Sequence, residues 1–170
     1  MGATIQGGDS QIGNGVGLRL IRPEELVVGT QVQQVTITGS TTSIKGGRKS
    51  AVDRSTAIEV AWGNLEVYDG TFGDSATAYS LNVFPAATGG TEVHIYGGQW
   101  SGKWTVSRDT VYVYGNDLEF TNTGGIGGTR CGDTTSTRIV EGVDKFFGGK
   151  VILRPCPSPY DPPTSFTECN

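Results

Sequence analysis

A ten-residue pattern occurs three times in the middle of the chain. It reads VHIYGGQWSG from Val93, with near-copies LEVYDGTFGD from Leu65 and VYVYGNDLEF from Val111. Each copy alternates apolar and polar residues, ends in Tyr and then runs into Gly, Asn or Asp. Such alternation is typical of a β-strand, whose successive side chains point to opposite faces, and the residues after Tyr favour a turn. Short runs of the same kind recur along the chain, so the sequence predicts an all-β protein.

Two all-β architectures fit many short strands, a β-sandwich and a solenoid of parallel strands. The repetition favours the solenoid, because equivalent strands then stack one rung apart and share the same neighbours. Aligning the copies predicts four columns of equivalent residues. Two point inward and consist of Val67, Ile95 and Val113, and of Leu65, Val93 and Val111. The tyrosines Tyr68, Tyr96 and Tyr114 form an outward column, and Phe72, Trp100 and Leu118 form a further inward column after the turn.

Apolar residues also fall at rung-like intervals upstream of the repeats. Ile44 precedes Val67, and Leu20 precedes Ile44, by similar numbers of residues. With the three copies they predict about five rungs. Parallel crossovers are almost always right-handed, so the predicted fold is a right-handed parallel β-helix.

The repeats resemble those of secreted, repetitive cell-surface proteins built from right-handed parallel β-helix coils, with units of the form V-x-I-Y-G-G-x-F-x-G. The resemblance covers about residues 65–128. It implies the pectin-lyase-like fold, and it carries over no functional residue.

Charge and composition exclude two classes of partner. The net charge is −4 with no clustered Lys and Arg, so nucleic acid is not an expected partner. No apolar stretch is long enough to span a membrane. The start of the chain has no signal-peptide pattern, and we interpret the sequence as an extracellular protein whose leader has been removed.

The last quarter of the chain departs from the repeat. We predict a β-helix domain over residues 1–128 and a Pro-rich cap over residues 129–170, which holds all three cysteines. A cap is needed because the last rung of a solenoid would otherwise expose its core. A Cys131–Cys156 disulfide would pin this tail to the coil, whereas a Cys156–Cys169 bridge would only close the tail on itself. The capping argument therefore favours Cys131–Cys156.

The candidate binding residues lie on the predicted outer face. They form the tyrosine column and, beside it, a row with the only histidine: Tyr68, Tyr96, Tyr114, Glu66, His94, Tyr112. Exposed aromatic rows either stabilise parallel strands or form a platform for a sugar or a protein.

The remaining acidic residues are scattered, and the sequence suggests a solvated, mildly acidic surface. No catalytic motif, metal site or cofactor site is predicted. The leading hypothesis is a non-enzymatic extracellular structural or adhesive module that assembles with itself or with surface polymers. The alternative is a β-helix that binds or cleaves an acidic polysaccharide. A third is an ice-binding protein, suggested by the threonine-rich TITGSTTS and TTST segments.

Overall fold

The computed structural model of this chain describes residues 4–6, 15–21, 34–38, 41–46, 55–74, 77–84 and 91–163. Every regular element in these ranges is a β-strand, which confirms the predicted all-β class. Within the same ranges there is no long apolar helix that could cross a lipid bilayer.

The strands form three sheets, named A, B and C here. Sheet A contains, in order, β1 (Thr4–Gln6), β4 (Ser43–Lys45), β7 (Thr71–Phe72) and β10 (Gln99–Trp100). Sheet B contains β2 (Val16–Leu20), β5 (Thr56–Val60), β8 (Tyr79–Val83), β11 (Lys103–Ser107) and β15 (Val143–Phe146). Sheet C contains β3 (Gln34–Ile37), β6 (Gly63–Val67), β9 (Thr91–Ile95), β12 (Thr110–Phe120), β13 (Ile126–Arg130) and β14 (Thr137–Val140), and β16 (Lys150–Arg154) also pairs with β12.

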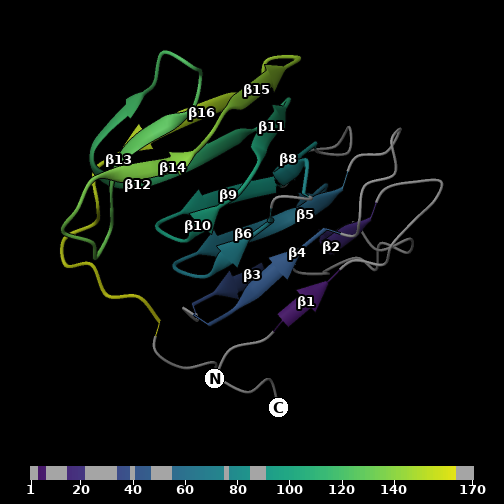
Figure 1. Ribbon diagram of the computed structural model, residues 1–170, viewed down its shortest axis with the longest axis horizontal. Coiled ribbons are helices and arrows are strands. Elements are labelled where there is room, and N and C mark those ends of the chain that lie inside the picture. Colours follow the sequence, from purple (N-terminus) through teal and green to yellow (C-terminus); the bar gives the residue numbers. More distant parts are fainter. Residues whose placement is uncertain are drawn as a thin grey trace, which may run out of the picture.

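The chain visits the three sheets in rotation from β1 to β12, so each strand pairs with the strand three places before it. All of these pairs are parallel, and Figure 1 shows the strands stacked in chain order from the purple N-terminal end. The exceptions are β13, which pairs antiparallel with β12, and β14, which pairs antiparallel with β13.

The predicted columns of sheet C are confirmed. Ile95 pairs with Val67 on one side and with Val113 on the other, and Val93 lies between Leu65 and Val111 in the same way. All six side chains are buried in one core cluster. The repeat copies are thus parallel neighbours in register, and they do not form the antiparallel hairpins of a sandwich.

The upstream alignment was wrong. Ile44 and Leu20 are both buried, but Ile44 pairs with Phe72 in sheet A and Leu20 pairs with Val60 in sheet B. The residue in the column of Val67 is Ile37. Spacing alone could not separate these columns, because each turn of the chain supplies one short strand to each of the three sheets.

The corner between sheets C and A is formed by the turns after Tyr68 and Tyr96. The amide of Tyr96 donates to the carbonyl of Val67, and the amide of Gln99 donates to that of Gly70, at 2.8 Å in both cases. The two turns therefore lie directly on one another. A Cβ on Gly97 would come within 2.2 Å of the Tyr68 carbonyl oxygen, so this close approach requires glycine.

Gly97→Ala is expected to destabilise the protein by about 1–3 kcal/mol, because the new methyl group can be accommodated only if the backbone of one turn moves. Gly127→Ala is the matched control, since its nearest contact would be at 3.6 Å. Urea denaturation of the two variants measures the difference. Equal losses of stability in both would contradict the close packing of the turns.

The C-terminal end of the core is closed by residues that follow the third repeat. Ile126 and Val140, from β13 and β14, are fully buried in the core cluster. In sheet B the inward column of Val83 and Val106 ends in Lys145, whose ammonium lies 5.0 Å from the centre of the Phe120 ring. Lys145 is exposed, and a charged side chain on the last strand of a sheet opposes the addition of another strand.

Two sequence predictions concern this region: the column of Phe72, Trp100 and Leu118, and the domain boundary at residue 128. Phe72 and Trp100 stack with ring centres 4.2 Å apart, but Leu118 does not continue their column, because β12 runs straight on to pair with β13. The expected boundary at residue 128 falls inside β13, and β15 and β16 beyond it extend sheets B and C.

Candidate binding site

Tyr68, Tyr96 and Tyr114 form a continuous stack on the outer face of sheet C, called the tyrosine ladder here. The ring centres of Tyr68 and Tyr96 are 4.6 Å apart, those of Tyr96 and Tyr114 are 4.3 Å apart, and the planes differ by 7° and 15°. Parallel strands in register place the rings one above another. Both faces of Tyr96 are therefore covered, and the ladder offers an open aromatic face only at its ends.

The second predicted row lies beside the ladder. Glu66, His94 and Tyr112 are register partners on adjacent strands, and the rings of His94 and Tyr112 stack at 5.0 Å. The two rows are joined by hydrogen bonds. The hydroxyl of Tyr68 donates to Glu66 at 3.3 Å, and Nδ1 of His94 lies 3.0 Å from the Tyr114 hydroxyl. The structure thus brings all six predicted residues together.

The electrostatics of the ladder favour neutral phenols. Burial raises the pKa of Tyr96 far above its ordinary value, and the neighbouring Tyr114, Tyr68 and Glu66 raise it further. Burial, followed by Glu66, also raises the pKa of Tyr68. Tyr68 and Tyr96 therefore remain protonated at neutral pH, and neither phenol can serve as a general base there.

A pocket of about 270 Å³, called the corner pocket here, opens at the turns between sheets C and A. It runs along successive turns and is covered by the segment after β16. Its lining residues are Thr38, Tyr68, Asp69, Gly97, Gly98, Gln99, Arg130, Cys131, Gly132, Asp133, Tyr160 and Pro162. One end of the tyrosine ladder therefore contributes to this pocket.

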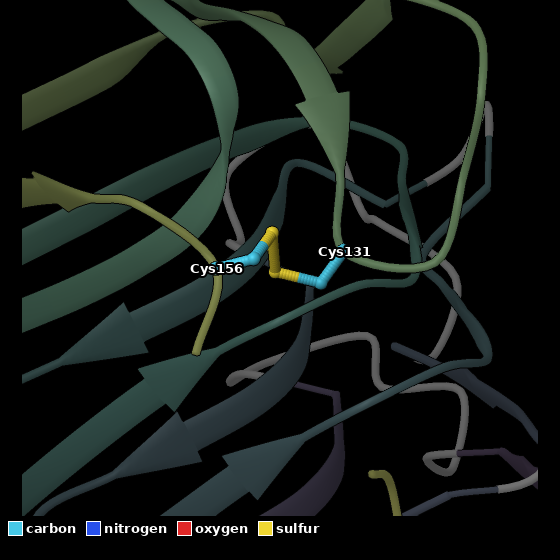
Figure 2. Close-up of a disulfide and its surroundings, with 2 residues drawn as sticks. All are labelled: Cys131 and Cys156. Carbon is cyan, nitrogen blue, oxygen red and sulfur yellow. A yellow bond between two sulfur atoms is a disulfide. The ribbon is translucent and has the colours of Figure 1, made fainter. Parts of the chain in front are cut away.

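The disulfide holds the covering segment in place. Cys131 and Cys156 are joined, as the capping argument predicted, and their Cα atoms are 5.6 Å apart. Figure 2 shows the bridge linking the loop after β13 to the chain after β16. The amide of Cys131 also donates to the Tyr96 carbonyl at 3.2 Å, so the bridge is anchored on a corner turn.

Tyr160 reaches the tyrosine ladder from the segment that the disulfide holds. Its ring centre lies 6.4 Å from that of Tyr68 and 6.4 Å from that of Tyr96. Because those two rings stack on each other, equal distances place Tyr160 beside the pair. The two aromatic rings that line the pocket, Tyr68 and Tyr160, thus come from distant parts of the sequence.

Arg130 fixes part of the lining of the corner pocket. Its Nε and Nη2 atoms contact the Asp133 carboxylate at 2.7 and 2.6 Å, and Nη1 donates to the Gly98 carbonyl at 2.9 Å. Such a paired carboxylate and guanidinium fix each other's orientation. Arg130 therefore joins the loop after β13 to the corner turn.

The sequence did not single out the pocket residues Asp69, Arg130, Asp133 and Tyr160 as a group. The one available signal was Cys131, because a bridge to Cys156 brings the loop after β13 and the tail together. Neither the ladder nor the pocket forms a metal centre: across the described ranges there is no group of three or more His, Cys, Asp or Glu side chains that could hold a metal ion.

The expectation of a wholly solvated acidic surface was wrong for Glu59. Its side chain is only 5% exposed, and it pairs with Nε of Arg19 at 2.5 Å. Burial is the largest influence and raises the pKa of Glu59, while Arg19 and Asn82 lower it. The folded protein therefore binds the Glu59 proton more tightly than the unfolded chain does.

The stabilisation that protonated Glu59 gives is expected to be complete below the ordinary glutamate pKa of ~4.3 and to be lost as the pH rises through the higher folded pKa. The free energy of unfolding, relative to Glu59→Gln, should thus fall as the pH increases over this window. Urea denaturation of both proteins between about pH 3.5 and pH 7 tests this. A difference that grows with pH would mean that the pair with Arg19 outweighs the effect of burial.

Comparison of the chain with protein-family models, with curated proteins and with solved structures found no match.

Proposed function

We propose that the chain is a right-handed parallel β-helix of about five rungs, closed at its C-terminal end, and that it serves as a non-enzymatic extracellular structural or adhesive module. The rotation of the chain through sheets A, B and C supports this fold. In a structure of this kind each rung buries its inner face against its neighbours, so the length of the stack can vary without loss of the core.

The observation that carries the functional proposal is the tyrosine ladder. Its rings stack face to face, with centres 4.6 and 4.3 Å apart, and they connect three successive strands on the outside of sheet C. Cross-strand aromatic pairs stabilise a sheet. An outer row built in this way serves to stiffen a scaffold, whereas an open binding platform needs free ring faces.

The disulfide supports the extracellular assignment, since such bridges persist in oxidising compartments and are rare in the cytosol. In the described ranges β2 and β3 each end their sheet at the N-terminal side, and an unpaired edge is a template for a further strand. At the opposite end β15 and β16 are the last parallel strands of sheets B and C, and they carry the exposed charged side chains of Lys145, Lys150 and Arg154. Charged side chains on an edge strand oppose the addition of a further strand. Assembly with itself by sheet extension would therefore use the N-terminal end.

The proposal is tested with the purified, oxidised protein in three assays. Light scattering and electron microscopy report self-assembly, an array of surface glycans and polymers reports adhesion, and a lyase assay on uronate polymers with Ca²⁺ reports catalysis. We expect self-assembly or polymer binding without turnover. Turnover that is lost in His94→Ala would overturn the non-enzymatic role and favour the polysaccharide-cleaving alternative.

A further inference from the structure

The corner pocket has a chemical character that the structural role does not require. We propose that it binds a primary alkylammonium group, such as the side chain of a lysine on a partner protein or a free alkylamine. This inference does not rest on the proposed function, because a structural module has no need of such a site. Charge, hydrogen-bonding capacity and aromatic surface each point to this ligand.

The charges of the pocket leave one carboxylate without a cation. Arg130 is paired with Asp133, and no ion pair joins Asp69 to a cation in the described part of the chain. One oxygen of Asp69 accepts a hydrogen bond from the Gly70 amide at 2.7 Å, and the residue lines the pocket. The three charged side chains thus carry a net charge of −1, which favours a cation.

The hydrogen-bonding groups of the pocket include a strong acceptor. Arg130 donates to Asp133 and to the Gly98 carbonyl, and Asp69 adds a carboxylate that accepts from the Gly70 amide. An ammonium group has three donors and no acceptor, so a carboxylate supplies the partner that it needs.

Aromatic surface completes the site. The Tyr96 amide donates to the carbonyl of Val67, the residue before Tyr68. The Tyr68 amide donates in the same way to the carbonyl of Ile37, the residue before Thr38. Thr38 therefore occupies the next position of the tyrosine column beyond Tyr68. Thr38 lines the pocket with Tyr68, so no ring continues the ladder on that side, and Tyr160 lies beside it. Aromatic faces attract ammonium groups through their negative π surface.

The influence of the two carboxylates extends to Tyr160. Burial raises the pKa of its phenol, and Asp69 and Asp133 raise it further. The phenol therefore stays protonated.

The test is a titration of the ¹⁵N-labelled, oxidised protein, followed by NMR at constant ionic strength. The probes are n-butylammonium, tetramethylammonium, which has the charge but no N–H donor, and methyl β-D-glucopyranoside, which is neutral. We expect n-butylammonium to shift the amide signals of Gly97, Gly98 and Gly132 saturably and to bind more tightly than tetramethylammonium. The glucoside should leave these signals unchanged.

Asp69→Asn is the decisive variant, because Asn keeps the acceptor for the Gly70 amide and removes the charge. It should weaken n-butylammonium binding about tenfold or more, the usual effect of losing a charged hydrogen bond. Asp144→Asn, on sheet B outside the pocket, is the matched control and should bind as the wild type does. An unchanged amide spectrum in Asp69→Asn, apart from the pocket, shows that the variant is folded.

Three results would each overturn the proposal. They are saturable binding of the glucoside at the same amides, tetramethylammonium binding at least as tight as that of n-butylammonium, and equal affinities of Asp69→Asn and the wild type for n-butylammonium. The absence of any shift with n-butylammonium would also overturn it. None of these outcomes bears on self-assembly or polymer binding, which the assays of the proposed function measure separately.

Discussion

Ile95→Asp is expected to unfold the protein. Ile95 is 1% exposed and lies between Val67 and Val113 in the inward column of sheet C, so the new carboxylate would have no partner and no water. Burying an unpaired charge costs several kcal/mol, which is comparable with the whole stability of a small domain. Circular dichroism and the dispersion of the amide NMR spectrum measure the loss of structure.

The adjacent residue supplies the control for this prediction. His94 lies on the same strand and on the outer face, where its contacts are to Tyr112 and Tyr114. His94→Asp places the same carboxylate one residue away, and it should leave the protein folded with a loss of about 1 kcal/mol. If His94→Asp unfolded the protein and Ile95→Asp did not, the assignment of the inner and outer faces of β9 would be wrong.

Removal of the disulfide should have the second largest effect. The bridge spans a sequence separation of 25 residues, for which the chain-entropy relation gives about 3–4 kcal/mol. The double variant Cys131→Ser, Cys156→Ser should lose this amount in urea denaturation. The segment that carries Tyr160 should also leave the pocket, which chemical shifts of Gly132 and Gly97 would report.

Reducing agent provides the control for the disulfide. It should lower the stability of the wild type to that of the double variant and should leave the double variant unchanged. Peptide mapping under non-reducing conditions should recover a fragment that links Cys131 to Cys156. A fragment that links Cys156 to Cys169, or three free thiols, would contradict the bridge.

The part of the fold that could be predicted is the part that repeats. The columns of Val67 and Leu65 were predictable because three copies of one pattern fix the register of β6, β9 and β12. Upstream, Ile44 and Leu20 were assigned to the wrong sheets, since a single apolar residue in a short strand carries no register information. Leu118 was misplaced because sequence alignment cannot tell where a strand turns a corner and where it continues.

The candidate site also has a part that could be predicted from the repeats and a part that could not. The six residues of the two outer rows were predictable, since alternation and repetition together determine which side chains lie side by side. The corner pocket was not, because Asp69, Arg130 and Tyr160 belong to three segments that only the folded tail brings together. The burial of Glu59 was also hidden, since its position in an alternating strand indicates an outward side chain and gives no sign of what covers it.

The position of the disulfide determines how the molecule should yield to mechanical tension. The bridge fastens the tail to the loop after β13, at the end of the stack where β15 and β16 lie, whereas β1, β2 and β3 at the opposite end have no such link in the described chain. Because each turn of the chain is held mainly by its neighbours, a pulling force should peel strands away progressively from the N-terminal end. The disulfide-linked end, with the corner pocket, would then be the last part to unfold. A ligand bound in the pocket would remain bound while the N-terminal strands extend.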